Sequence, residues 1–465
     1  MTEKAPFLRD SGRAEPRKAC GIELDFGRQR LTGSDFDLLL ALAAERRVLE
    51  RHRAMIAGEV VNPSEKRPAL HTSLRSFSSR SPEYEVVRAE RKRFLDFSED
   101  VREGRRQGCR GHRITDVINV GIGGSDVGLR TVYNALRSPT PEVRLHFLAA
   151  ADGIQLERIL AACDPRSTLA VISSKSFKTR ETMVNAAAID QWFLNAGIVG
   201  LDRRHHMVVV SADPSAARVM CLPEENLFHS WKWVGGRFSV WGATGLPVAI
   251  ALGAAKFEQF LRGAEMMDRH SLEAAPEENI PLLVSLFSYW NSTRWLMSSH
   301  CLLPYDERLT DLVPWLQQLE MESLGKSPAD ASGRPTGQSV WGCHGNQAQH
   351  SFFQWLREGT SRSSIDLIWC EMPSHRFAEH HRCLLANARA QAEALVERED
   401  EKGCFNALTT IAMQAVTPSS LGALMAMYEH KTTMLGTLYG LNPFDQPGVE
   451  FGKRLSLELE RSGSN

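Results

Sequence analysis

The stretch "VINVGIGGSDVGLR", residues 117–130, decides the fold prediction. Its first four residues form an apolar run that indicates a strand, and the run breaks into three glycines ahead of a segment with helical apolar spacing. Glycines let the backbone pass close to a ligand, and the free N–H groups at the start of a helix favour an anion. The loop therefore predicts a phosphate-binding turn, with a tight turn that binds nothing as the alternative.

The loop does not match the two common nucleotide-binding motifs. The dinucleotide fingerprint G-x-G-x-x-G would need a third glycine where Asp126 stands. A Walker loop would need Lys and then Ser or Thr after its last glycine, but Gly128 is followed by Leu129 and Arg130. The pattern thus indicates a phosphate without a nucleotide.

The strand–turn–helix pattern continues along the chain. Between about 115 and 215 the apolar runs VINVG, VRLHFLA, TLAVISS and MVVVS alternate with helix-length segments, the longest over 180–195. This alternation predicts parallel strands in a doubly wound α/β domain. A second such unit begins near 281, where we expect a helix over 281–299, strands at SVWG, IDLIWC and ALTTIAMQ, and an amphipathic helix over 375–399.

Composition narrows the class of protein. The chain has 465 residues, is 43% apolar and has a net charge of −1, so it can bury large cores and shows no sign of a polyanion-binding surface. The N-terminus has no signal-peptide pattern, and no apolar run is long enough to span a bilayer. The nine cysteines are scattered, without a C-x-x-C motif, which favours free thiols. We expect a cytoplasmic protein with no nucleic-acid or membrane partner.

The 15 histidines raise the question of a metal site. The adjacent pairs His205–His206 and His380–His381 diverge on a strand or a helix, and His375 lies among charged residues. This pattern is more typical of a solvated helix face than of a ligand set, so we expect no metal.

A second loop, ISSKSFKTRET at 172–182, again follows a predicted strand and precedes a predicted helix. It offers the hydroxyls of Ser173, Ser174, Ser176 and Thr179 and the charge of Lys175. Such groups can hold a phosphate monoester without a metal, although a Ser/Thr N-cap cluster is the alternative. Ligands of open α/β sheets bind outside the carboxyl ends of the strands, so the two loops should lie at the same edge.

Further segments carry side chains suited to proton transfer. The segment WVGGRFSVWGATGLP contains Arg237, which can stabilise a developing oxyanion. The segment WLQQLEMESLGK offers Glu320 and Glu322 as bases for proton abstraction next to a carbonyl. His350 in QAQHSFFQW and Lys453 in FDQPGVEFGK are acid–base candidates. The same residues could instead be a salt-bridged arginine, a charged helix end, a core histidine and a solvated lysine.

In chain order, GIGGS, SSKSFKTRET, VGGRFSVWGATG, QQLEMESLGK, QHSFFQ and FDQPGVEFGK resemble the phosphoglucose isomerase (glucose-6-phosphate isomerase) family. The segment NPSEKRPALHTSLR at 62–75 is also similar, and the resemblance runs from about 55 to 455. Several spaced motifs in the same order are far more specific than any one of them.

The resemblance implies an α/β fold with two doubly wound parallel-sheet domains of the sugar-isomerase (SIS) type. We expect a helical N-terminal segment over 1–75 that packs on the second domain, a first domain with the phosphate loops over 76–255, a second domain over 256–440 and a C-terminal segment with the catalytic lysine over 441–465. It also implies a homodimer with the active site at its interface, hexose 6-phosphate substrates, and neither a metal nor a redox cofactor.

The resemblance further implies a role for each motif. The 6-phosphate would be held by Ser125, Ser174, Lys175, Ser176 and Thr179, with the backbone of Gly124, while Gln318 and Gln446 would line the sugar site. Glu322 would move a proton between C2 and C1 through a cis-enediolate that Arg237 stabilises. His350, which comes from the partner subunit in family structures, and Lys453 would open the sugar ring.

Some residues depart from the family pattern. Ser176 and Lys178 stand where Thr is common, Ala348 replaces a frequent Gly, and Pro447 replaces a frequent Trp beside Gln446. The change at Pro447 leaves open a broader isomerase that also accepts mannose 6-phosphate. Three further functions compete with the isomerase: a non-catalytic sugar-phosphate sensor, a nucleotide-dependent oxidoreductase and a metal-dependent aldose isomerase.

Overall fold

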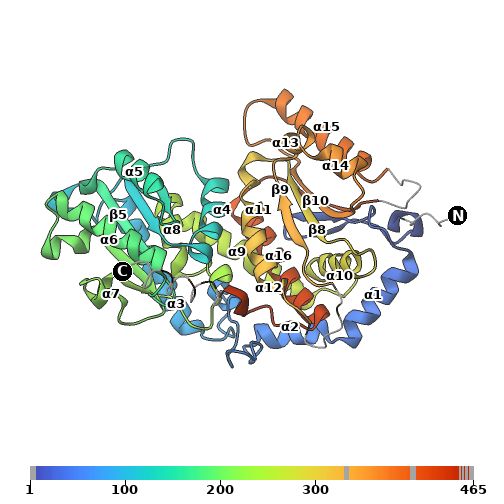
Figure 1. The fold of residues 1–465 in the computed structure, drawn as a ribbon, viewed down its shortest axis with the longest axis horizontal. Coiled ribbons are helices and arrows are strands. Elements are labelled where there is room, and N and C mark those ends of the chain that lie inside the picture. Colours follow the sequence, from blue (N-terminus) through green and yellow to red (C-terminus); the bar gives the residue numbers. More distant parts are fainter. Residues whose placement is uncertain are drawn as a thin grey trace.

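The computed structural model describes residues 7–328, 333, 335–397, 405–449, 452, 455 and 459. The chain forms two lobes side by side, each built on its own β-sheet (Figure 1). Helices α9 (Ala254–Glu273) and α16 (Pro418–Tyr439) pack against each other between the two sheets. No helix in the described part of the chain is long and apolar enough to cross a membrane.

The first sheet has five parallel strands in the order β4-β3-β5-β6-β7. They are β3 (Asp116–Val120), β4 (Arg144–Leu148), β5 (Thr168–Ser173), β6 (Met207–Ser211) and β7 (Leu227–His229). Every residue of β3, β5 and β6 is buried, as expected of strands that helices cover on both faces. The four strands predicted between 115 and 215 are confirmed, whereas β7 is too short to show in the sequence.

Helices cover both faces of this sheet. One face packs against α5 (Gly153–Ala162), α6 (Arg180–Asn195) and α7 (Ala216–Val219). The other packs against α3 (Tyr84–Arg102), α4 (Val127–Leu136) and α8 (Leu246–Leu252). The helix predicted over 180–195 is confirmed as α6.

The second sheet has six strands in the order β1-β2-β11-β10-β8-β9. They are β1 (Arg17–Ala19), β2 (Ile22–Asp25), β8 (Ser299–Pro304), β9 (Ser339–Gly342), β10 (Ser363–Cys370) and β11 (Ala407–Met413). The strands β11, β10, β8 and β9 are parallel, as predicted for an α/β fold, and β1 and β2 add an antiparallel edge.

Helices also flank the second sheet. Helix α15 (Ala378–Ala394) packs on one face, and α10 (Ile280–Thr293) and α16 lie on the other (Figure 1). The remaining α-helices of the described residues are α1 (Gly33–Glu45), α2 (Val48–Ile56), α11 (Leu312–Leu316), α12 (Glu322–Leu324), α13 (Gly345–Gln349) and α14 (Phe353–Glu358).

Two local predictions need correction. The apolar segment 281–299 is not one helix, because α10 ends at Thr293 and Leu296 adopts a left-handed φ of 53° before β8 begins. The N-terminal segment over 1–75 is not only helical, because β1 and β2 join the second sheet through β11. Strands of three or four residues are too short to carry a clear alternation of apolar and polar positions.

Candidate active site

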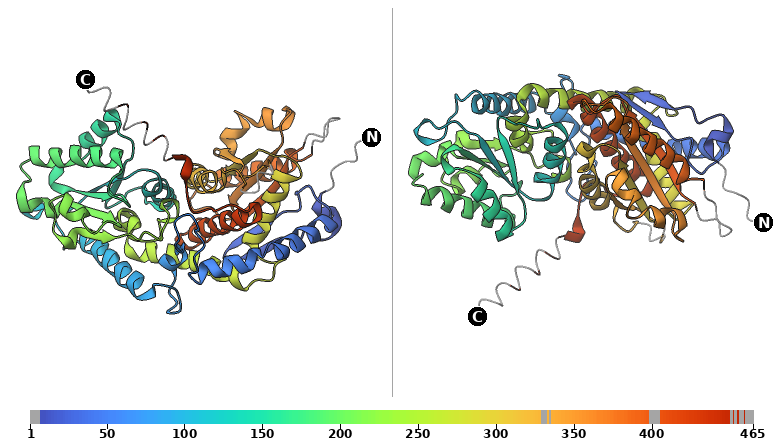
Figure 2. Two further views of the ribbon diagram at one scale, coloured as in Figure 1. Left: turned by 60° about the horizontal axis from the view of Figure 1, so that its bottom comes forward. Right: turned by 90° about the horizontal axis from the view of Figure 1, so that it is seen from above.

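A cavity of about 720 Å³ lies where the two lobes meet. It is lined by eight of the residues singled out in the sequence: Gly124, Lys175, Ser176, Thr179, Arg237, Gln318, Glu322 and Gln446. The segment that follows α16 returns to this junction, as Figure 2 shows in red. Loops at the carboxyl ends of β3 and β5 form one side of the cavity, and the loop of Arg237 together with segments beyond residue 317 forms the other.

The first glycine loop brings two parts of the cavity wall into contact. After β3 the backbone passes through a 3₁₀ turn, η4 (Gly123–Ser125), in which Gly123 has a left-handed φ of 62°. A Cβ atom on Gly124 would lie 2.1 Å from the carbonyl carbon and oxygen of Gly236, so only glycine fits there. The side chain of Ser125 accepts a hydrogen bond from Ser173 Oγ at 3.1 Å and does not line the cavity.

The second loop presents hydroxyl groups to the same side. Ser176 and Thr179 line the cavity, and Thr179 is the N-cap residue of α6, but its side chain makes no capping bond. Ser174 is buried, does not line the cavity, and donates to Thr179 Oγ1 at 3.3 Å. Phe177 adopts a left-handed φ of 51°, which turns the loop sharply between the two hydroxyls.

Cationic side chains make this side of the cavity attractive to an anion. Lys175 Nζ donates to the carbonyl of Val234 at 2.6 Å. Burial, helped by the nearby charge of Arg67, lowers the pKa of Lys175 to about 8. Arg67 and Lys232 also line the cavity, Arg67 in an ion pair with Glu65. We did not single out either residue from the sequence, although Arg67 lies in the family-like segment 62–75.

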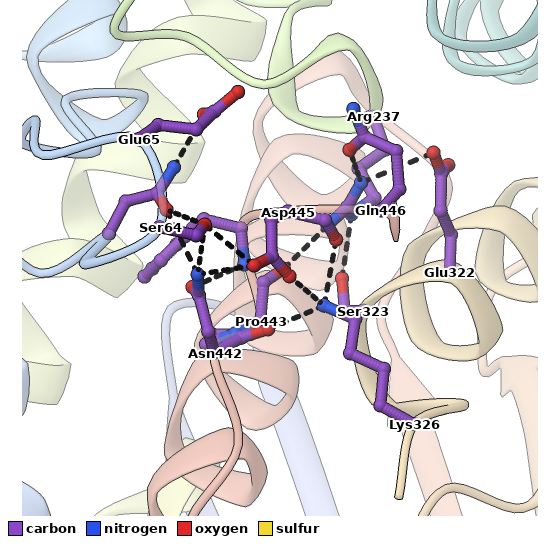
Figure 3. A network of polar contacts seen from close by, with 12 residues as sticks. Ser64, Glu65, Arg237, Glu322, Ser323, Lys326, Asn442, Pro443, Asp445 and Gln446 are labelled. Atoms are coloured by element: carbon purple, nitrogen blue, oxygen red, sulfur yellow. Dashed lines mark hydrogen bonds and ion pairs between the residues drawn. The ribbon is translucent and has the colours of Figure 1, made fainter. Parts of the chain in front are cut away.

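Arg237 occupies the centre of the opposite side. Its guanidinium is buried and donates to Ser323 Oγ at 2.7 Å, Gln446 Oε1 at 3.0 Å and the carbonyl of Pro443 at 2.6 Å (Figure 3). Its Nη1 lies 3.3 Å from Glu322 Oε1. Burial lowers the pKa of Arg237, and the charges of Glu322 and Asp445 oppose this effect. The guanidinium is therefore held rigidly beside a carboxylate.

The two glutamates of the segment WLQQLEMESLGK, of which the family resemblance favours Glu322, lie in different environments. Glu322 begins α12, lines the cavity and keeps about 24% of its side chain exposed. Glu320 is buried away from it, 2.8 Å from Lys431 Nζ and 3.5 Å from His300 Nδ1. They are separated because residues two apart along a helical turn point to opposite faces, and the chain here forms a π-helical turn, η11 (Gln317–Met321). Such turns are frequent at functional sites.

Gln318 on this π-helical turn faces the first glycine loop. A Cβ atom on Gly123 would lie 3.1 Å from Gln318 Nε2. Gln318 Oε1 is buried and has no hydrogen-bond partner among the described residues.

One further expected catalytic residue is not brought to the cavity. His350 is exposed just after α13 and does not line it. Lys453 lies outside the described residues. The expectation that His350 serves a partner subunit concerns a second chain and stays a prediction.

The cavity does not coincide with a cluster of metal ligands. Within the described residues, one compact group could hold a metal ion: Asp116, His146 and Cys163. None of them lines the cavity, and Asp116 already binds His146 Nε2 and Arg144 Nη2, each at 2.8 Å. The histidines at 205, 206, 375, 380 and 381 do not contribute to this group.

Known proteins resemble nearly the whole chain. A model of the phosphoglucose isomerase family matches residues 25–465. A glucose-6-phosphate isomerase of Burkholderia multivorans is 43% identical over 95% of this chain and 86% of its own length, and glucose-6-phosphate isomerase 2 of Cupriavidus pinatubonensis is 42% identical over 96% and 87%. The crystal structure of a glucose-6-phosphate isomerase from Chlamydia trachomatis superposes with a TM-score of 0.86 at 27% identity, covering 98% of this chain and 92% of that one. The chain therefore belongs to the phosphoglucose isomerase family.

Proposed function

We propose that the chain catalyses the reversible aldose–ketose isomerisation of glucose 6-phosphate and fructose 6-phosphate. One observation carries the proposal: a single cavity joins an anion-binding side to a carboxylate and a guanidinium whose charged atoms are 3.3 Å apart. The names of the similar proteins support the same reaction. The enzyme would serve glycolysis and gluconeogenesis in the cytoplasm.

The phosphate would bind at the carboxyl ends of β3 and β5. The hydroxyls of Ser176 and Thr179, the N–H groups around Gly124 and the positive charges of Lys175 and Arg67 favour a phosphate dianion there. Ser174 supports this site through its bond to Thr179, and Ser125 through its bond to Ser173. This end of the cavity would hold the substrate while its carbonyl end lies near Arg237.

Proton transfer would occur at the other end. The hydrogen next to the carbonyl of an open-chain sugar is weakly acidic, so its removal needs a close base and a stabilised oxyanion. The Glu322 carboxylate would take the proton from C2 of the aldose and deliver it to C1, through a cis-enediolate. Arg237 would stabilise the negative oxygen, and Gln318 and Gln446 would bind the sugar hydroxyls.

Ring opening needs a separate acid and base. We assign these roles to His350 and Lys453, with His350 reaching the cavity of a partner in a homodimer. The exposure of His350 at the end of α13 is compatible with that role. No step requires a metal ion, so we expect EDTA to leave the activity unchanged, and complete loss that metal restores would contradict the mechanism.

Proton NMR of fructose 6-phosphate in deuterium oxide tests the function directly. Removal of hydrogen from C1 and return of an exchanged hydrogen to C2 should give glucose 6-phosphate that carries deuterium at C2. A mannose 6-phosphate signal growing at a similar rate would indicate the broader isomerase. Binding without any product would indicate a sugar-phosphate sensor.

A further inference from the structure

The segment after α16 is fastened to the cavity wall by a polar network around Lys326 and Asp445 (Figure 3). The Lys326 ammonium donates to Asp445 Oδ1 and to the Asp445 carbonyl, both at 2.7 Å, and to the carbonyl of Asn442. An ammonium has three hydrogens, so all its donors are used within the segment 442–445. Lys326 thus has no hydrogen left for a substrate.

The carboxylate of Asp445 connects three parts of the chain. Its Oδ2 accepts from Ser64 Oγ at 2.6 Å and from Asn442 Nδ2 at 2.9 Å, while Oδ1 accepts from Lys326. Burial alone would raise the pKa of Asp445, but the bonds from Lys326 and Ser64 outweigh it and hold the pKa below its ordinary value. The carboxylate is therefore ionised at neutral pH and keeps its ion pair.

The network leads to both reacting groups. Lys326 lies four residues after Glu322. The intervening position 325 requires glycine, because a Cβ atom there would lie only 2.5 Å from the Met321 carbonyl oxygen. In the segment that follows α16, the carbonyl of Asp445 accepts a hydrogen bond from Arg237 Nη2 at 3.2 Å. The next residue, Gln446, accepts from Arg237 Nη1.

Neither Lys326 nor Asp445 lines the cavity of about 720 Å³ that holds Glu322 and Arg237. Their side chains are about 15% and 21% exposed. Both line an adjoining cavity of about 550 Å³ together with Glu322 and Gln446. Because all three hydrogens of the Lys326 ammonium are already donated, we expect the pair to act on the reaction through other residues. A base and an oxyanion-stabilising group must be placed within a fraction of an ångström to be effective, and a misplacement of about 1 Å can cost roughly 100-fold in rate.

We propose that Lys326 and Asp445 are a positioning pair for the isomerase site: by tying the segment of Glu322 to the segment of Gln446, they hold Arg237 and Glu322 in reacting geometry. This inference rests on the proposed function. It assigns a role to two residues outside the expected catalytic set.

The test compares Lys326→Met, Asp445→Asn and the double variant in steady-state isomerisation of fructose 6-phosphate. Each single change should lower kcat by about 10- to 100-fold and change KM by less than about 3-fold, because the phosphate loops are untouched. The double variant should be about as impaired as either single variant, since both changes break the same connection. Lys326→Arg keeps a cation for Asp445 and should recover most of the lost turnover.

Lys92→Met is the matched control, because it removes an exposed ion pair with Asp96 on α3 and should keep kcat within about 2-fold. The measured activity is divided by the fraction of folded protein, which circular dichroism gives. Residues that only stabilise the fold would then leave the corrected kcat unchanged. Near wild-type kcat in both single variants, or losses that multiply in the double variant, would overturn the positioning pair while leaving the proposed function intact. An inactive wild-type enzyme would overturn both.

Discussion

The two sides of the cavity are built in different ways. On the phosphate side, Gly124, Ser176 and Thr179 belong to short turns that follow directly from β3 and β5. On the reaction side, Arg237 contacts Ser323 and Gln446, which are 86 and 209 residues away along the chain. The proposed anion site thus depends on local backbone geometry, whereas the placement of the proposed reacting groups depends on contacts between distant segments. The comparison predicts that changes on the reaction side affect turnover and changes on the phosphate side affect substrate affinity.

The largest effect should come from Glu322→Gln. The amide keeps the shape of the side chain but cannot accept the substrate proton, so kcat should fall by about 10²- to 10⁴-fold while KM changes little. Steady-state kinetics with fructose 6-phosphate measures both constants. Glu181→Gln, which changes a carboxylate on the phosphate side of the same cavity, is the control and should keep kcat within about 3-fold. Turnover of Glu322→Gln near that of the wild type would disprove the assignment of the base.

The second-largest effect should come from the close contact between Gly124 and the Gly236 backbone, where the two sides of the cavity meet. Gly124→Ala would place a methyl group 2.1 Å from the Gly236 backbone and push the Arg237 loop away from the phosphate loop. We expect kcat/KM to fall by about 100-fold, with both constants affected, and the melting temperature to decrease. Gly153→Ala is the matched control, because its added Cβ has no atom within 4 Å. Equal activity of the two variants would show that the close approach at Gly124 does not matter.

A smaller effect should follow from removing the phosphate-side hydroxyls. Ser176→Ala and Thr179→Ala each delete one hydrogen bond to a charged group, which is worth about 1.5–3 kcal/mol, so KM should rise by about 10- to 100-fold. The value of kcat should change by less than about 3-fold, since the base and Arg237 are unaffected. Kinetics across substrate concentration separates the two constants. A loss confined to kcat would contradict the division of roles between the two sides.

The smallest effect is a pH dependence from Lys175, whose pKa is lowered to about 8. Below that pH the lysine is charged and attracts the phosphate dianion, and above it the charge and the attraction are lost. The ratio kcat/KM, which reports the free enzyme, should therefore decline several-fold as the pH rises through about 8. Lys175→Arg stays protonated and should lack this decline. An identical alkaline profile in both enzymes would mean that another group titrates.

Much of the fold was predictable because its signals are local. The strands of the first sheet and the helix over 180–195 follow from short apolar runs and from helical spacing, which depend on neighbouring residues only. The break between α10 and β8 was not predictable, because the apolar residues continue through it and only the backbone turn at Leu296 separates the two elements. The short strands β1 and β2 become strands by pairing with β11, near the other end of the chain.

The sequence by itself determined the parallel α/β class, the family, and the two turns for which we propose anion binding, because glycines, hydroxyls and a helix start act over a few residues. The family resemblance already favoured Glu322 over Glu320 as the base, but only the tertiary structure shows that Glu322 faces the cavity while Glu320 is buried beside Lys431. It also brought Arg237 to Gln446 and Lys326 to Asp445. Charged side chains need partners within a few ångströms, and spacing along the chain does not reveal which distant segments supply them.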